Sequence, residues 1–181
     1  MGRGRGVCRV RRGTGGRLGI YGFGASAHLT AQVAIAQGAE VHVLTRGQEA
    51  RELALQLGAA SVGGPFDPAP VPLDSAIIFA PAGKLHQWRW SPLGPGGTLA
   101  LAGIHMSNIP VLDYQRHLFQ ECTIRSVTSN TRHDGEEFLV LAQRLGVQVT
   151  TTPVAFEHAD LALRDLAAGH VPGAAVLSLT R

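Results

Sequence analysis

Residues 18–28, LGIYGFGASAH, decide the fold class of this chain. The stretch begins as a short apolar run and passes into Gly22-Phe23-Gly24-Ala25-Ser26-Ala27, which fits the pattern G-x-G-x-x-[GA]. An alanine-rich helical pattern follows over 25–37, and Gly38 after it is typical of a helix C-terminus. A second apolar run at 41–44 completes a strand–helix–strand unit of about thirty residues.

In this context the glycine turn predicts a dinucleotide-binding site. Gly22 permits the tight turn, Gly24 lets backbone N–H groups approach a pyrophosphate, and Ala27 is small enough for close packing of helix on strand. The beginning of the helix adds unpaired donors and the positive end of its dipole. We therefore assign six residues to cofactor binding: Gly22, Phe23, Gly24, Ala25, Ser26 and Ala27. A glycine-rich turn with no ligand is the alternative.

The end of the second predicted strand concerns the choice of cofactor. An NAD site typically has Asp or Glu there to hold the ribose hydroxyls, whereas this chain has Thr45 and Arg46. Glu40 lies at the beginning of the strand and cannot take that role. Because Thr45 and Arg46 could bind a 2′-phosphate, we expect NADP to be favoured over NAD. A solvated surface arginine is the alternative for Arg46.

Strand and helix patterns continue to alternate with short loops, which predicts an α/β fold with a doubly wound parallel sheet of about six strands. Further strands are expected at 60–62, 74–80, 98–102 and 123–127, and helices at 48–57 and 134–145. A turn is expected at Gly94-Pro95-Gly96-Gly97.

The pattern changes after Gly146. A strand is expected at 147–151, ending before Pro153, then a helix at 160–168 and a last strand at 174–179. We divide the chain into a disordered Arg/Gly leader at 1–16, a Rossmann domain that binds NAD(P) at 17–146, and a C-terminal segment at 147–181.

Composition excludes several classes of protein. Six of the 16 basic residues lie within 1–17, and without them ten basic residues face 13 acidic ones, so the net charge of +3 comes from residues 1–17. The leader has no aromatic residue for base stacking, so we expect no nucleic-acid partner. No run of about 18 apolar residues is present to span a membrane. The two cysteines, Cys8 and Cys122, form no C-x-x-C pair, and we expect a cytoplasmic protein.

Five stretches of the chain together resemble a known family. They are LGIYGFGASAH, the Thr45-Arg46 strand end, PGGTLALAGIH, IPVLDYQRHLFQECTIRSVTSNTRHDGEEFL and GVQVTTTPVAFEHADLALRDLAAGHVPGAAVL. Over residues 17–181 the chain resembles the zinc-type medium-chain alcohol dehydrogenases, in particular the bacterial propanol-preferring alcohol dehydrogenase A group. Residues 86–92 depart from that family, because Pro92 would interrupt the helix expected there.

The resemblance implies an enzyme that transfers hydride between a small alcohol and NAD(P), giving an aldehyde or ketone. In that family a preceding GroES-like domain holds the zinc ligands, and the last segment, here 147–181, packs on it. Neither Cys8 nor Cys122 matches the zinc pattern, so we expect a truncated dehydrogenase with no catalytic residue and no metal ligand, inactive alone. A stand-alone nucleotide-binding module and an interaction protein on the same scaffold remain alternatives.

The resemblance also implies residues near the nicotinamide and a mode of assembly. Positions lining the nicotinamide pocket in the family correspond to Ala102, Gly103, Ile104, Val127 and Ser129. Related enzymes pair the edge of the sheet, here near 123–127, across a two-fold axis. We therefore expect a homo-oligomer.

Overall fold

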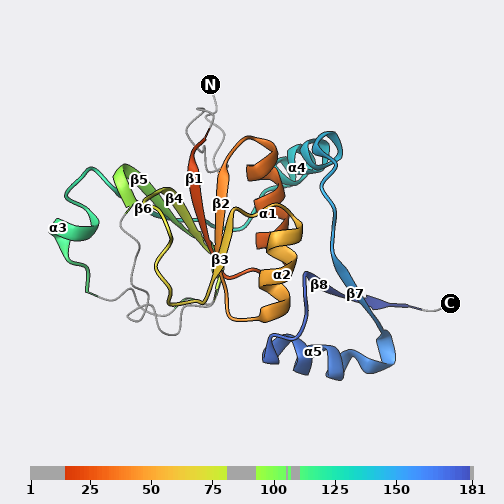
Figure 1. The fold of residues 1–181 in the computed structure, drawn as a ribbon. Coiled ribbons are helices and arrows are strands. Elements are labelled where there is room, and N and C mark those ends of the chain that lie inside the picture. Colours follow the sequence, from red (N-terminus) through yellow and green to blue (C-terminus); the bar gives the residue numbers. More distant parts are fainter. Residues whose placement is uncertain (1–14, 81–92, 105, 107–110, 180–181) are drawn as a thin grey trace.

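The computed structural model describes residues 15–80, 93–104, 106 and 111–179. The expected leader up to residue 14, Cys8, and the family departure at 86–92 lie outside the described residues. The described chain forms one six-stranded sheet, a smaller sheet of two strands, and helices that connect and cover them (Figure 1).

The large sheet is parallel throughout and has the strand order β3-β2-β1-β4-β5-β6. Its strands are β1 (Arg17–Tyr21), β2 (Glu40–Leu44), β3 (Ser61–Gly63), β4 (Leu73–Ile78), β5 (Leu93–Leu101) and β6 (Thr123–Ser126). The connections include α1 (Ala25–Ala36), α2 (Gln48–Gln56) and α3 (Tyr114–His117). This is the Rossmann strand order, so the predicted fold class is confirmed.

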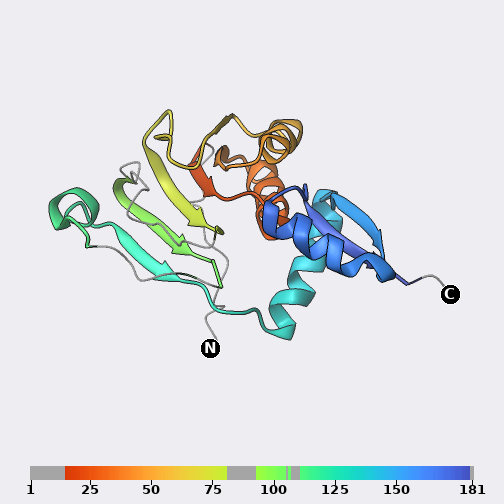
Figure 2. The same cartoon turned by 90° about the horizontal axis from the view of Figure 1, so that it is seen from below.

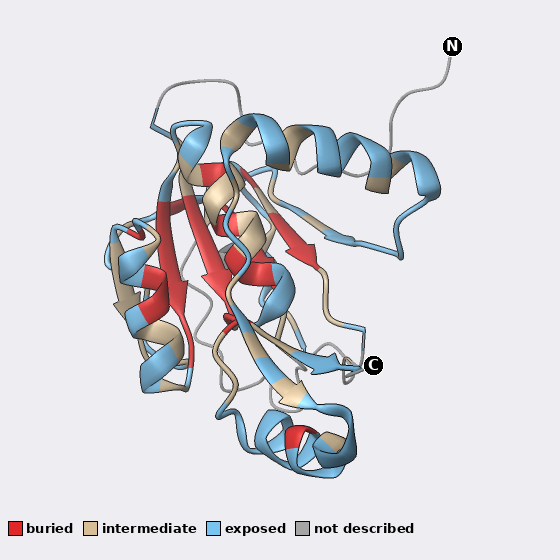
Figure 3. Ribbon diagram, turned by 90° about the vertical axis from the view of Figure 1, so that its right-hand side faces the viewer, coloured by how far each residue is buried: buried red, intermediate tan, exposed pale blue. Residues whose placement is uncertain are grey.

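The central strands β1, β2 and β4 are buried on both faces of the sheet, which explains why they are rich in apolar residues. Leu18 and Ile20 of β1 join Val41 and Val43 of β2 in a core cluster with α1. The opposite face holds a second cluster: Tyr21, Leu44, Leu73, Ala76, Ile78, Leu99 and Leu101. Figure 3 shows the buried centre of the sheet and the much more exposed C-terminal part.

The predicted turn at Gly94-Pro95-Gly96-Gly97 lies within β5. Leu73 pairs with Leu93, but Ser75 pairs with Thr98, so four residues of β5 bulge out opposite one residue of β4. Gly96 has φ of +71°, a conformation that favours glycine. The sequence pattern therefore located the turn correctly, although the strand begins before it.

Helix α4 (Arg132–Leu145) follows β6 and contacts α1. Its first turn is held by a capping box, in which the Thr131 side chain accepts from the Asp134 amide and the Asp134 carboxylate accepts from the Thr131 amide. The Thr131 amide and the Thr131 hydroxyl both donate to the Asp134 carboxylate, and these two hydrogen bonds lower the pKa of Asp134. The helix ends at Gly146, which is left-handed with φ of +65°.

The C-terminal part is a separate strand–helix–strand unit, which we call the C-terminal unit. It consists of β7 (Thr151–Ala155), the short 3₁₀ turn η2 (Phe156–His158), α5 (Ala159–Ala168) and β8 (Ala174–Ser178), with β7 and β8 parallel (Figure 2). The strand expected at 147–151 is wrong, because β7 begins at Thr151 and runs through Pro153. Both strands of a two-stranded sheet are edges, where a proline is tolerated.

None of the helices in the described ranges has the length and apolar character that a membrane crossing requires.

Candidate functional site

The carboxyl ends of the six strands are joined by one row of backbone hydrogen bonds. In each case the first residue after a strand donates to the last residue of the neighbouring strand. The bonds are Thr45 N to Gly63 O at 3.0 Å, Gly22 N to Leu44 O at 2.9 Å, Phe79 N to Tyr21 O at 2.9 Å, Ala102 N to Ile78 O at 2.9 Å, and Val127 N to Leu101 O at 2.9 Å. The six strand ends therefore form a single continuous edge.

The predicted site residues form two groups, one at the glycine turn and the tip of β2, the other implied by the family resemblance. Both groups lie along this edge. Thr45 and Gly22 occupy neighbouring places on it, and Ala102 and Val127 occupy two further places beyond β4. Four strand spacings separate β2 from β6, which is about 19 Å at the usual spacing. The edge matches an extended ligand that crosses the point between β1 and β4 where the chain reverses its direction of winding.

Gly22 is required by the fold itself. It has φ of +86°, and a Cβ there would lie 2.8 Å from the Ala80 nitrogen and 2.9 Å from the Ala80 Cβ. The chain can therefore turn from β1 into α1 only with a glycine at this position. Ala80, just after β4, is a site residue that the sequence interpretation missed. The strand order would have located it, because β4 neighbours β1.

Gly24 differs from Gly22, because a Cβ at Gly24 would meet no protein atom within 4 Å. Gly24, Ala25 and Ser26 are exposed, and no side chain caps α1. The first turn of α1 therefore presents backbone donors to open space, with a positive partial charge from the helix dipole. An anion is the ligand that suits such a helix terminus.

Two of the six turn residues have buried side chains. Phe23 is 5% exposed and Ala27 is 1% exposed, and both belong to the core cluster beneath α1. Ala27 thus has the packing role that its size predicts. Only the backbone of Phe23 is available to a ligand.

The two residues at the end of β2 differ in accessibility. Thr45 is buried, at 7% exposed, and its N–H is used by Gly63. Arg46 is exposed. Arg46 is therefore the accessible cation here, while Thr45 mainly completes the strand end.

The part of the edge at the ends of β5 and β6 is exposed and partly apolar. Ile104 is 93% exposed and Val127 is 43% exposed, and Ser129 is exposed as well. Gly103 is packed tightly, since a Cβ there would lie 3.0 Å from Met106 Cγ and 3.2 Å from the Ala80 oxygen. Exposed Ile104 and Val127 offer apolar surface for a flat ring or for another part of a longer protein.

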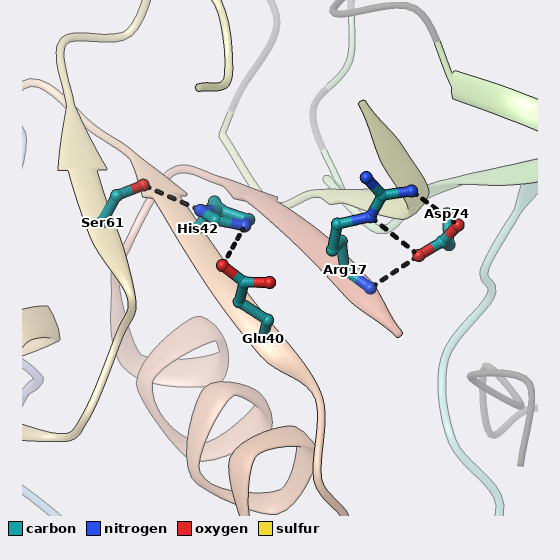
Figure 4. A network of polar contacts seen from close by, with 5 residues as sticks. All are labelled: Arg17, Glu40, His42, Ser61 and Asp74. Carbon is teal, nitrogen blue, oxygen red and sulfur yellow. Dashed lines mark hydrogen bonds and ion pairs between the residues drawn. The ribbon is translucent and has the colours of Figure 1, made fainter. Parts of the chain in front are cut away.

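A polar network lies at the other end of the strands, away from this edge (Figure 4). The Asp74 carboxylate accepts from the backbone N–H and the side chain of Arg17, at 2.8 Å and 3.3 Å. In β2, His42 Nδ1 lies 2.8 Å from Ser61 Oγ, and its Nε2 lies 3.6 Å from a Glu40 oxygen. Glu40 is therefore far from the end of β2, as its sequence position predicted.

The described residues contain no group of three or more His, Cys, Asp or Glu side chains that could hold a metal ion. Cys122 is a free thiol, 3.7 Å from the Gly94 oxygen.

Comparisons with known proteins agree with the geometry. No family model matches the chain. The chain is 58% identical over 173 residues to the Mycobacterium tuberculosis protein named "Probable alcohol dehydrogenase AdhA", covering 96% of this chain and 50% of that protein. Two curated relatives match most of this chain, and the chain spans about half the length of each.

Solved structures share the fold. An alcohol dehydrogenase from Aeropyrum pernix has a TM-score of 0.78 at 21% identity, covering 91% of this chain and 50% of its own. The CAD protein of Helicobacter pylori, solved in complex with NADP(H), has a TM-score of 0.76 at 20% identity, covering 92% and 48%.

Proposed function

Since this chain is a relative of the alcohol dehydrogenases and corresponds to about half of one, we propose that it supplies the NAD(P)-binding portion of an enzyme that interconverts alcohols and aldehydes or ketones. The observation that carries the proposal is the single edge of strand ends that holds Gly22, Thr45, Ala102 and Val127. A nicotinamide dinucleotide bound there supplies the hydride acceptor or donor of the reaction.

Each part of the edge has its own task in this proposal. Backbone donors of Gly24, Ala25 and Ser26 hold the pyrophosphate at the N-terminus of α1. The tip of β2 holds the adenosine ribose. Residues 102–104, Val127 and Ser129 orient the nicotinamide ring and shield it on the apolar side.

We further propose that NADP is preferred to NAD. Arg46 is exposed at the tip of β2, where a 2′-phosphate would lie, and an arginine can bind a phosphate with two parallel hydrogen bonds. No carboxylate follows β2 directly to hold ribose hydroxyls or to repel the phosphate.

The family resemblance implies that the zinc ligands lie in a preceding domain, outside the part of the relatives that this chain matches. We propose that the 181-residue chain alone binds no stoichiometric zinc and oxidises no alcohol, since its described residues contain no ligand set. Metal analysis of the purified chain tests this, and one tightly held zinc per chain would contradict it.

The domain division extends the proposal. Residues 17–146 form the nucleotide-binding domain, and 147–181 pack on the further domain of the whole enzyme. Exposed apolar side chains of the C-terminal unit support this: Phe156, Leu161, Leu163, Leu166, Val176, Leu177 and Leu179. Two distant cysteines and no C-x-x-C pair support a cytoplasmic location.

Calorimetric titration with NADP and NAD tests the central proposal. Binding of either nucleotide at a one-to-one ratio is expected, and binding of neither would favour the interaction-protein alternative. If nucleotide binds, the gene sequence upstream separates the remaining two possibilities. An in-frame GroES-like domain indicates a dehydrogenase half, and its absence a stand-alone module.

A further inference from the structure

His28 lies in the first turn of α1 and is completely buried, at 0% exposed. Its ring lies between two backbone groups that are far apart in sequence. Nδ1 is 3.3 Å from the Gly24 oxygen. On the other side, the Thr150 N–H donates to Nε2 at 3.3 Å, across 122 positions of sequence. The side chain thus joins the glycine turn to the beginning of the C-terminal unit.

These two partners determine the tautomer of the imidazole. A backbone N–H can only donate, so Nε2 must accept and carries no proton. Nδ1 then carries the ring proton, and the Gly24 oxygen opposite it can only accept. Both ring nitrogens are satisfied only in the neutral Nδ1–H form of His28.

The peptide group that accepts the hydrogen bond from Nδ1–H is part of the proposed phosphate site. The Gly24 carbonyl and the Ala25 N–H belong to the same peptide, and both residues are exposed at the uncapped start of α1. Gly24 O also accepts the helical bond from His28 N at 3.1 Å. Hydrogen bonds polarise one another along a chain, so a carbonyl that accepts two donors makes its own N–H a stronger donor.

The segment around Thr150, at the other end of the contact with His28, is also held by hydrogen bonds. One turn along α1, Gln32 donates to the Gln148 oxygen and accepts from the Gln148 N–H, both at 2.8 Å. The Thr150 oxygen accepts from Ala174 N at 3.0 Å, beside the first β7–β8 pair. Residues 148–150 are therefore bonded to α1 on one side and to the C-terminal unit on the other.

We propose that His28 is a positioning residue that couples the nucleotide site to the C-terminal unit through the chain Thr150–His28–Gly24. The inference rests on the proposed nucleotide binding. A phosphate that accepts from Ala25 N–H strengthens the whole chain of hydrogen bonds and so tightens the hold on Thr150. Coupling of binding is reciprocal, so a well-packed C-terminal unit in turn strengthens nucleotide binding.

Hydrogen–deuterium exchange with and without saturating NADP tests the coupling in the full 181-residue chain. NADP is expected to slow exchange in the glycine turn at 22–27, and also in 148–155 and 174–178. His28→Asn keeps a donor near Nδ1 but does not reach Thr150, and His28→Gln keeps an acceptor near Nε2 but loses the donor to Gly24. In both variants the slowing at 22–27 should persist, while that in the C-terminal unit disappears.

Thr30 gives a matched control on the same helix. Its hydroxyl donates to the Ser26 oxygen at 2.9 Å, a bond of the same i to i−4 kind, but Thr30 is only partly buried and none of its described hydrogen bonds reaches 148–150. Thr30→Ala should leave the transmitted slowing intact. The His28 variants should also bind NADP about fivefold more weakly, as expected for the loss of one hydrogen bond.

The outcomes separate the two proposals. If NADP binds but exchange in the C-terminal unit does not change in the parent chain, the coupling is wrong and the proposed function stands. If the parent chain binds no nucleotide, both are wrong. The tautomer is checked in the parent alone by ¹⁵N–¹H spectra of the imidazole, so the test does not depend on the folding of a variant. An Nε2–H tautomer for His28 would overturn the relay.

Discussion

Gly22 and Ala80 are packed so closely that the turn into α1 has no room for a side chain: a Cβ on Gly22 would lie 2.8 Å from the Ala80 nitrogen. Gly22 also has φ of +86°. We predict that Gly22→Ala destabilises the fold, by about 1–2 kcal/mol for the left-handed backbone and by about 1–3 kcal/mol more for overpacking against Ala80. Urea unfolding measures this, and an unchanged midpoint would contradict the close packing of Gly22 on Ala80.

Gly24→Ala should have little effect on stability but should weaken nucleotide binding. Gly24 has φ of −107°, and a Cβ there meets no protein atom within 4 Å, so the free energy of unfolding should fall only by the cost of alanine at an N-cap, about 1 kcal/mol or less. Nucleotide affinity should fall by at least about tenfold, because the methyl group occupies the space of the pyrophosphate. Unfolding and calorimetry on the same sample give both numbers. Unchanged NADP affinity would show that the pyrophosphate does not lie against Gly24.

Arg46→Gln tests the choice of cofactor. A charge-assisted hydrogen bond to phosphate contributes about 1.5–3 kcal/mol, or about 10- to 150-fold in affinity, and exposure of Arg46 places the expected loss toward the lower end. NADP affinity should fall by that factor while NAD affinity stays constant. An additional Thr45→Asp change is a poor choice, because Thr45 is buried and a carboxylate there would be desolvated. Equal loss for both nucleotides would show that Arg46 does not contact the 2′-phosphate.

The buried His42 should make stability depend on pH. Burial lowers its pKa from the ordinary 6.5, Glu40 opposes the shift and Arg17 adds to it. Because the folded pKa lies below the unfolded one, the unfolded chain binds more protons, and stability is complete above pH 6.5 and decreases as pH falls below it. One proton limits the slope to about 1.4 kcal/mol per pH unit.

His42→Gln removes this titration and keeps a polar group near Ser61. The free energy of unfolding of the parent minus that of the variant should be constant above pH 6.5 and should fall below it. Subtracting the variant removes the contribution of the other histidines. A difference that stays constant down to pH 5 would show that the pKa of His42 is not lowered in the folded chain.

The sequence predicted the large sheet well because the information is local there. The glycine turn, the Ala-rich helix and the apolar runs each indicate their own element, and Gly94-Pro95-Gly96-Gly97 marks a real irregularity in β5. The strand expected at 147–151 was wrong for a non-local reason. Apolar and β-branched residues there are typical of a strand, but Gln148 and Thr150 are bonded to Gln32 and His28 of α1.

The candidate site was predictable in position but not in accessibility. Residue patterns place Thr45, Ala102 and Val127 at strand ends, and the structure puts them in one row with Gly22. Whether a side chain at a strand end points into the core depends on packing from distant elements. Burial of Thr45 and Phe23, and the closeness of Ala80, therefore could not be predicted from local sequence.

We expect self-association through β6, which with β3 is one of the two edge strands of the large sheet among the described residues. An unpaired strand edge is a template for pairing with a second chain, and apolar surface beside it adds to the tendency. The connection between β5 and β6 supplies that surface, since Val111 is 100% exposed, Tyr114 is 61% exposed and Phe119 is 59% exposed. Sedimentation at micromolar concentration should therefore detect a dimer or a larger species. Thr123→Lys, at an exposed position of β6, should shift the chain toward monomer because a lysine blunts an edge strand, while Thr123→Ser should not. A parent chain that sediments as a clean monomer, or a lysine variant that associates as strongly as the parent, would show that β6 is not the contact.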